Sequence, residues 1–266
     1  MTTPQMTLGE AAYQNSMRIV RQLIEAGADP NVSEDGLVPL REACFNENIP
    51  MIKYLLEHGA NPNECDPDCG QSILESFIWS YRRVTPLDRK ITKISKKPYP
   101  YDQPANRAVL RRLLRAGADP NLPTNALRPV FHEAIFKNVK RVVAIFLEYG
   151  ADVNQRGKVH DGETPLMTAA YFADISIMEM LLEHGADINA RDGEGHNALF
   201  YIVAGMCPWQ EVLPRFKLLF KYGIDLHART KHGENILQYG SRLDKTTRHW
   251  LCIHGVKEGE CSLSLL

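Results

Sequence analysis

The stretch Leu181-Leu182-Glu183-His184-Gly185-Ala186-Asp187-Ile188-Asn189 has a close relative in Leu55-Leu56-Glu57-His58-Gly59-Ala60-Asn61-Pro62-Asn63. Both place a glycine shortly after a pair of large apolar residues. Further copies are centred on Gly27, Gly117, Gly150, Gly223 and, in degraded form, Gly255. Consecutive glycines lie 32, 58, 33, 35, 38 and 32 residues apart, so most intervals are close to 33 residues. This period predicts a stacked array of repeats, one of which carries an insertion of about 25 residues.

Each of these glycines predicts the end of a helix, because a left-handed residue after the last turn gives the final carbonyls partners and glycine adopts it without strain. The Asp, Asn and Pro residues that follow favour turns. Apolar pairs such as Ile177-Met178, ahead of Leu181-Leu182, give each helix a broad buried stripe. We expect the helix amino-termini to be capped by the side chains of Asn15, Asn48, Asn138 and Asp174.

A preceding helix is predicted where proline opens a helical turn and small alanines follow, in segments 37–44, 128–134 and 162–170. Within the last of these, Thr164-Pro165-Leu166-Met167-Thr168-Ala169 is similar to the Thr-Pro-Leu-His-x-Ala signature of the ankyrin-repeat family. The chain resembles that family over nearly its whole length. The resemblance implies a turn or hairpin finger, an inner helix and an outer helix per repeat, with a concave, finger-lined face that most often binds proteins.

The chain also departs from the family pattern. Arg41, Phe131 or Met167 takes the place of the signature histidine, and Pro208 and Pro214 precede or interrupt the outer helix of the sixth unit. We predict an all-α ankyrin-repeat solenoid of about seven helix-turn-helix units with short hairpin or turn fingers. No Ser/Gly/Pro-rich linker divides it, so we expect one domain over residues 1–266. Its repeats are expected near 2–34, 35–68, 69–125 (with an insertion at 81–103), 126–160, 161–194, 195–232 and a capping repeat at 233–266.

The near-neutral net charge of −1 conceals a strong asymmetry. Between Arg82 and Ala116 there are eleven Lys or Arg residues against Asp88 and Asp102. The basic insertion is a candidate docking site for an acidic protein, or for nucleic acid or an anionic membrane, and the alternative is a merely solvated loop. Its candidate residues are Arg82, Arg83, Arg89, Lys90, Lys93, Lys96 and Lys97.

The finger tips are a second candidate binding surface, because folding does not require particular side chains there and loops on rigid elements commonly carry function. Simple solvation is the competing explanation for their mixed charges. The candidate residues are Ser33, Asp35, Asp66, Asp68, Gln155, Arg156, Asp161, Arg191, Asp192, Glu194, Lys231 and His232.

Catalysis is not indicated, since the sequence lacks a Gly-rich phosphate loop, a nucleophile elbow and a paired set of zinc ligands. His132-Glu133 begins like a metalloprotease motif, but Phe136 stands where the second histidine is needed. Cys65 and Cys69 are interpreted as free thiols, with a local disulfide and a metal clip as the alternatives. We expect no enzyme activity, no metal and no cofactor.

The sequence shows neither a Sec-type leader nor eighteen consecutive apolar residues, so we expect a cytoplasmic protein without a membrane span. Secretion by a route without a Sec-type leader, and a leader removed from a longer precursor, are the alternatives. Polar residues in the last repeat predict a monomer. The predicted function is a non-enzymatic protein–protein interaction module or adaptor, with an acidic partner where the insertion is involved and nucleic acid disfavoured. The alternative is an ankyrin-type inhibitor, immunity protein or secreted bacterial effector that occludes or redirects a partner enzyme.

Overall fold

The computed structural model describes residues 6–32, 36–66, 70–79, 104–123, 128–205, 208–240 and 243–257. These residues form helices joined by turns, and none of them belongs to a named β-strand, although Cys65 and Ser72 form an isolated antiparallel bridge. The all-α prediction is confirmed, and the described fingers are turns. Residues 81–103, predicted as the insertion, lie outside the described part, and the repeat boundaries stay predictions.

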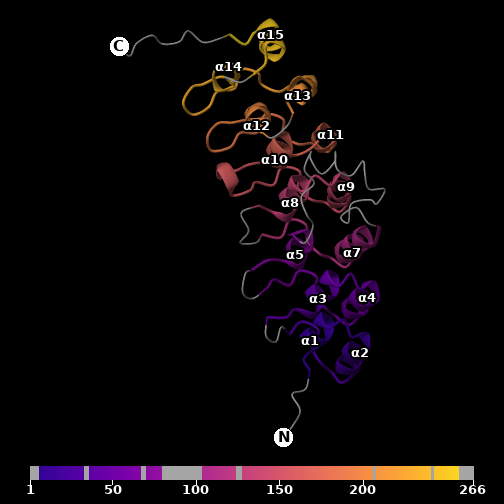
Figure 1. Ribbon diagram of the computed structural model, residues 1–266. Coiled ribbons are helices and arrows are strands. Elements are labelled where there is room, and N and C mark those ends of the chain that lie inside the picture. The colour runs from indigo at the N-terminus through magenta and orange to yellow at the C-terminus, as the bar shows by residue number, and fades with distance from the viewer. Residues whose placement is uncertain are drawn as a thin grey trace. The chain divides into compact units, whose positions relative to one another are not determined.

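The helices come in successive pairs, each made of an inner helix followed by an outer one (Figure 1). The inner helices are α1 (Leu8–Tyr13), α3 (Pro39–Phe45), α5 (Ile73–Trp79), α8 (Val130–Phe136), α10 (Pro165–Phe172), α12 (Ala198–Ala204) and α14 (Ile236–Tyr239). The outer helices are α2 (Met17–Glu25), α4 (Ile49–Glu57), α7 (Pro104–Arg115), α9 (Lys140–Glu148), α11 (Ile175–Glu183), α13 (Trp209–Lys221) and α15 (Lys245–Ile253).

The chain divides into two compact units, Met1–Ala151 (unit 1) and Asp152–Leu266 (unit 2). In unit 1, α1 packs on α3, α3 on α5 and α5 on α8, while α4 packs on α7. In unit 2, α10 packs on α12 and α12 on α14, and the outer helices α13 and α15 also meet. Each unit therefore has its own stack of inner helices.

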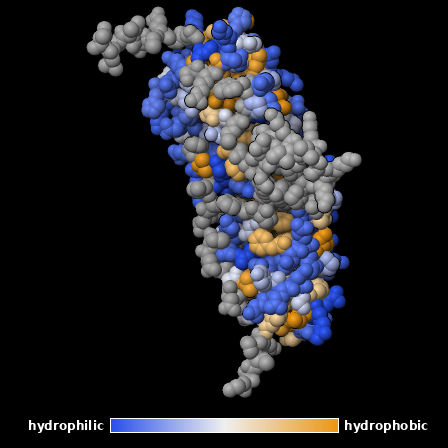
Figure 2. All heavy atoms as spheres, viewed as in Figure 1, coloured by the Kyte–Doolittle hydropathy of each residue, from blue (hydrophilic) through white to orange (hydrophobic). Residues whose placement is uncertain are grey.

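The cores consist of the apolar stripes that the sequence predicts. In unit 2, Ile177, Met178 and Leu181 of α11 are fully buried. Ala169 and Ala170 of α10 are also fully buried, and their small side chains let the next inner helix approach closely. On the face drawn in Figure 2, the described residues are mostly hydrophilic, with hydrophobic side chains in small separate areas.

The predicted helix ends are confirmed by the backbone. All seven repeat glycines have φ between 81° and 93°, in the left-handed region. The amide that follows each of them reaches back to a carbonyl five residues earlier, as in Ala186 N–H to Leu181 O at 3.0 Å. The histidine before the glycine adds a contact, since the Nδ1 atom of His184 lies 2.8 Å from the carbonyl oxygen of Met180.

The predicted amino-terminal caps are right only in part. Asn48 caps α4, with its side-chain oxygen accepting from Met51 N–H at 3.0 Å. Asn15 and Asn138 are not caps: they have φ of 58° and 60° and turn the chain just before the N-cap residues, Ser16 and Val139. Asparagine tolerates this left-handed conformation better than most residues. Asp174 occupies the cap position of α11, but its side chain makes no capping bond.

Shortly after outer helices α2, α4, α9 and α11, an asparagine side chain forms hydrogen bonds to the repeat that follows. In unit 2, the Asn189 side chain accepts from Asp225 N–H at 2.7 Å and donates to the carbonyl oxygen of Gly223 at 3.2 Å. Asn154 makes the same pair of bonds to Asp187 and Gly185. In unit 1, Asn31 and Asn63 do so with the repeats that follow them. We call this two-bond contact the asparagine clamp.

The clamp asparagine is held in place by the acidic or amide residue two positions before it. Asp187 Oδ1 accepts from the backbone N–H of Asn189 at 3.0 Å, which closes a local turn. In the last such segment His227 replaces the asparagine, and among the described residues the local turn made by Asp225 remains without the two bonds to the next repeat. The Asp-x-Asn pattern thus combines a turn former with a residue that reaches the next repeat.

We expect Asn189→Ala to lower the free energy of unfolding by about 1–2 kcal/mol, because two partly solvated hydrogen bonds between repeats are lost. Urea denaturation of the full chain provides the measurement. His227→Ala is the matched control at the same position of the next repeat, and it should stay within about 0.5 kcal/mol of the parent. Equal effects of the two substitutions would contradict the clamp.

We expect Gly185→Val to cost about 1–2 kcal/mol of stability through backbone strain. Gly185 has φ of 86°, and a Cβ atom there would meet nothing within 4 Å, so crowding does not contribute. Gly185→Asn should cost clearly less, because asparagine enters the left-handed region more readily. Thermal unfolding of both variants tests this, and an asparagine variant no more stable than the valine variant would argue against it.

Candidate interaction surface

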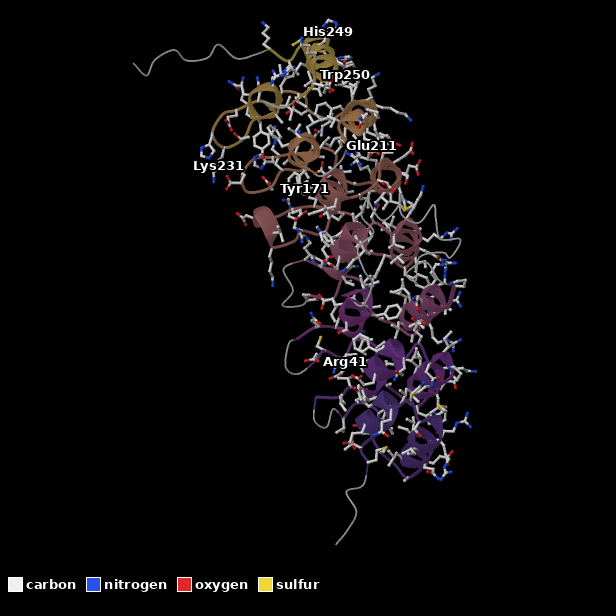
Figure 3. The ribbon with its side chains drawn as sticks, in the orientation of Figure 1. Arg41, Tyr171, Glu211, Lys231, His249 and Trp250 are labelled. Atoms are coloured by element: carbon white, nitrogen blue, oxygen red, sulfur yellow. The ribbon has the colours of Figure 1, made fainter. Side chains whose placement is uncertain are left out.

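The three fingers of unit 2 are the best-described part of the predicted binding surface. They are residues 152–164, 184–197 and 222–235, each joining an outer helix to the next inner helix. We call the surface formed by these fingers and the exposed parts of α10, α12 and α14 the finger face. In Figure 3, Lys231 lies on the third finger and Tyr171 on α10.

Neighbouring fingers are joined by backbone hydrogen bonds. The amide of Gly193 donates to the carbonyl oxygen of Asp161 at 2.9 Å, and the amide of Lys231 donates to that of Glu194 at 2.7 Å. Gly193 is required at this contact, since a Cβ atom there would lie 2.5 Å from Asp161 Oδ2 and 2.7 Å from its Cβ. The fingers are therefore held in a fixed row before any partner arrives.

Several predicted site residues also link one finger to the next through their side chains. Arg156 Nη1 donates to the carbonyl oxygens of Gly162 and Arg191, at 3.0 and 2.8 Å. Arg191 pairs with Asp225 at 2.9 Å, and Lys231 pairs with Glu194. The side chains of these two ion pairs are 40–49% exposed, so each contributes about 0–1 kcal/mol and is easily rearranged.

Asp192 has a different role from the one the sequence suggests. It is buried, and its Oδ1 atom accepts from the backbone N–H groups of Glu194 and His196 at 2.9 and 2.8 Å. Its Oδ2 atom accepts from the hydroxyl of Tyr201 at 2.8 Å and lies 3.2 Å from His196 Nδ1. Burial, followed by this hydrogen bond to Asp192, raises the pKa of Tyr201 above its usual value. Asp192 thus organises the second finger from inside.

The remaining predicted finger residues fall into three groups. Gln155 is half-buried, whereas Asp161 and His232 are exposed, and Asp161 has φ of 51°. In unit 1, Asp66 is mostly buried in an ion pair with Arg41, which is labelled in Figure 3. Ser33, Asp35 and Asp68 lie outside the described residues, as do all seven candidates of the basic insertion.

The surface includes an aromatic hollow that the sequence analysis did not identify. It is an open cavity of about 120 Å³ on the finger face of unit 2. It is lined by Tyr171, His196, Phe200, Tyr201, Ala204 and Tyr239. None of α10, α12 and α14 contains Lys, Arg, Asp or Glu, whereas α1, α3, α5 and α8 in unit 1 each contain a glutamate. The absence of charged residues from these three inner helices was the sequence feature that could have indicated the hollow.

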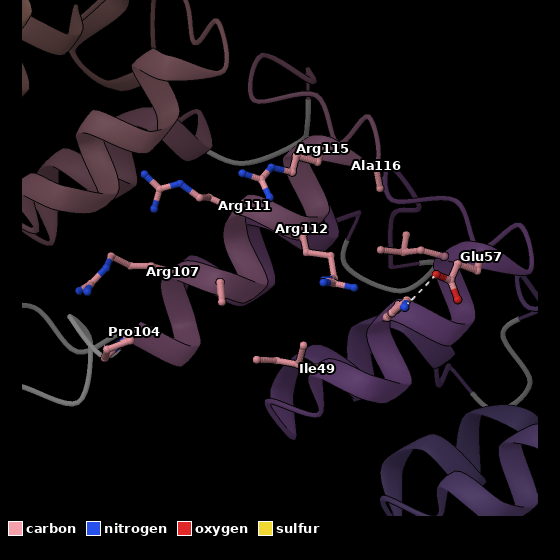
Figure 4. A pocket seen from close by; sticks show the side chains of 11 residues that line it. Ile49, Glu57, Pro104, Arg107, Arg111, Arg112, Arg115 and Ala116 are labelled. Carbon is pink, nitrogen blue, oxygen red and sulfur yellow. Dashed lines mark ion pairs between the residues drawn. The ribbon is translucent and has the colours of Figure 1, made fainter.

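A second depression lies on the outer-helix side of unit 1. It is a groove of about 650 Å³ between α4 and α7 (Figure 4). Helix α7 contributes Arg107, Arg111, Arg112 and Arg115, the last arginines of the basic stretch found in the sequence. Arg111 pairs with Glu148 at 3.0 Å, and Arg115 Nε donates to the Tyr149 hydroxyl at 3.0 Å. The basic stretch therefore continues from the insertion onto a described helix.

Metal and redox chemistry receive no support from the described residues. Among them, no group of three or more His, Cys, Asp or Glu side chains is placed to hold a metal ion. Cys44 is a buried thiol whose pKa is raised by burial and by the nearby Glu42. Cys69 lies outside the described residues, so the state of Cys65 and Cys69 stays a prediction. No helix in the described ranges is long and apolar enough to cross a bilayer.

Comparison with known proteins identifies the family. The sequence model described as "Ankyrin repeats (3 copies)" matches residues 5–79 and 103–192, and the chain belongs to the ankyrin-repeat family. The predicted family and fold are confirmed. Ankyrin-repeat domains mediate protein–protein interaction and are typically non-enzymatic.

Curated relatives match over a limited stretch. Neurogenic locus notch homolog protein 1 of Cricetulus griseus is 39% identical over 95 residues, covering 35% of this chain and 4% of that protein. Ankyrin repeat and SOCS box protein 6 of Homo sapiens is 34% identical over 94 residues, covering 35% of this chain and 22% of that protein. The match thus spans a small fraction of either relative.

Two solved structures share the fold. The ankyrin repeat domain of Bcl-3 superposes with a TM-score of 0.70 at 20% identity, covering 95% of this chain and all of that one. The human ASB11 ankyrin repeat domain gives a TM-score of 0.66 at 22% identity, covering 96% of this chain and 99% of that one. At these identities the likeness concerns the fold alone.

We expect Tyr201→Phe to lower the free energy of unfolding by about 1.5–3 kcal/mol, because a hydrogen bond to the buried carboxylate of Asp192 is lost. Tyr239→Phe is the matched control: it removes the same atom from a tyrosine whose hydroxyl makes no hydrogen bond to the described residues, and it should cost less than about 0.5 kcal/mol. Denaturant unfolding compares the two. A neutral Tyr201→Phe variant would argue against the internal role of Asp192.

Proposed function

We propose that this chain is a non-enzymatic protein-binding module that holds its partner on the finger face of unit 2. The observation that carries the proposal is the row of fingers joined by backbone hydrogen bonds, Gly193 to Asp161 and Lys231 to Glu194. Such a row is preorganised, so little ordering entropy is lost when a partner binds.

The side chains on this row are suited to recognition. The ion pairs of Arg191 with Asp225 and of Lys231 with Glu194 are weak because they are exposed, and a partner's charges can replace them at low cost. Exposed side chains such as His232 and Glu234 make no side-chain hydrogen bond in the described structure. The backbone fixes the finger positions, and the side chains remain available to a partner.

An acidic partner remains our proposal for the basic stretch. Support comes from α7, whose four arginines border the α4–α7 groove, and from the outer helices of unit 1 as a group. Helices α2, α4, α7 and α9 carry nine Lys or Arg residues against three Glu. A surface of this sign attracts acidic segments and makes their association dependent on salt.

The test is site-specific photo-crosslinking in an extract of the source organism. A photoreactive amino acid at His232 or at Glu234, both exposed on the third finger, should give one discrete adduct with a second protein. The matched controls place the same group at Glu179 or Glu183, which are exposed on outer helix α11 of the same unit. Adducts from α11 but not from the finger would contradict docking on the finger face.

A further inference from the structure

The aromatic hollow is of a size that suits the end of a single side chain. Its volume of about 120 Å³ corresponds to roughly four water molecules. Pockets for drug-sized ligands or cofactors are usually larger, at about 300–1,000 Å³. The hollow is open to solvent on the finger face, where the proposed partner docks.

The walls of the hollow are aromatic rings set at steep angles to one another. The ring centres of His196, Phe200 and Tyr239 are mutually 5.2 Å apart, with interplanar angles of 44°, 56° and 79°. Tyr201 stands edge-on to His196 at 82°. A cation within about 6 Å of an aromatic face is attracted by the ring quadrupole. Tilted rings suit a compact ammonium group better than a planar guanidinium, which binds by stacking on parallel faces.

Negative charge lies beside these rings. The side chain of Asp192 is 0% exposed, and its only ion-pairing partner among the described residues is His196, which is charged only when protonated. Burial, and then the charges of Asp192 and Glu234, raise the pKa of Tyr239. Asp192 and Glu234 therefore bring negative charge toward the ring of Tyr239, and the inner helices α10, α12 and α14 supply no cation of their own.

The space exists because of one small residue. Tyr171 is the seventh residue of α10, and Ala204 is the seventh residue of the following inner helix, α12. Tyr171 has a phenol ring at this position, whereas Ala204 has only a methyl group, which is exposed at the hollow. A larger side chain at position 204 can fill the hollow without changing the buried core.

We propose that this hollow receives the ammonium group of a lysine side chain presented by the protein partner. This inference rests on the proposed function, since it names the chemistry that the partner brings to the finger face. The half-buried rings of Tyr171 and Tyr239 supply cation–π attraction, and Asp192 supplies the countercharge through the adjacent Tyr201 and His196.

The test uses the full chain with ¹³C-labelled tyrosine rings and small blocked amino acids as probes, followed by NMR. Nα-acetyl-lysine N-methylamide should shift the Tyr239 ring signals saturably, and it should bind at least about 10-fold more tightly than the norleucine analogue of similar length. The ε-trimethylated probe distinguishes a methylated from an unmodified lysine of the partner. Tighter binding than that of the unmodified probe indicates a methylated lysine, and weaker binding indicates an unmodified one.

Variants keep the test specific to the hollow. Ala204→Leu should abolish the lysine-dependent shifts, and Tyr239→Leu, which keeps apolar bulk but removes the ring, should weaken binding at least about 5-fold. Tyr239→Phe should retain binding, as followed by the Tyr171 signals, and so should Tyr222→Leu at the end of outer helix α13. Circular dichroism verifies that each variant is folded.

Three results would overturn the inference: equal binding of the lysine and norleucine probes, tighter binding of the arginine analogue, or unchanged lysine binding in folded Ala204→Leu. Crosslinking from His232 separates this from failure of the proposed function. If the finger gives adducts but the ammonium probe does not bind, docking on the finger face stands and only the lysine site is wrong. If the ammonium probe binds but the finger gives no adducts, docking of the partner on the finger face is contradicted instead.

Discussion

Stacking of these repeats depends on burial of their apolar stripes against one another, and the asparagine clamp adds a directional contact to that burial. Its two bonds, such as those of Asn189 to Asp225 and Gly223, can form only when the next repeat is in place. Gly223, at the end of the next outer helix, provides one acceptor for this contact, because carbonyl oxygens at a helix end lack a partner within the helix. A pair of short helices cannot bury its apolar stripe alone, so neighbouring repeats must bury their stripes together.

The same logic of neighbour contacts extends into the fingers of unit 2. Backbone bonds fix the spacing of the fingers, and the buried Asp192 fixes the shape of the second finger through Tyr201 and two amides. Stability therefore resides in atoms that face inward, while the charged side chains at the surface contribute little to it. This division leaves a rigid surface whose side chains are free to differ between family members that bind different partners.

The sequence located the finger residues, but not the environment of each side chain. It placed Arg191, Asp192 and Lys231 on fingers, where the structure has them, but charge alone did not separate the buried Asp192 from its exposed neighbours. The aromatic hollow was not predicted, because its rings come from one finger and three helices spread between Tyr171 and Tyr239. The sequence signal was the uncharged, aromatic composition of these inner helices.

By itself the sequence determined the repeat period, the helix pairs and the positions where each outer helix ends. These features follow from local sterics and from burial of a periodic stripe, both of which are properties of short segments. Only the tertiary structure decided that Asn15 and Asn138 turn the chain instead of capping it, what each clamp asparagine bonds, and where a hollow opens beside Ala204. The clamp bonds and the hollow depend on atoms about one repeat away along the chain, which packing between repeats brings together. The turns at Asn15 and Asn138 are local, but asparagine suits both a left-handed turn and a cap, and only the backbone shows which one it adopts.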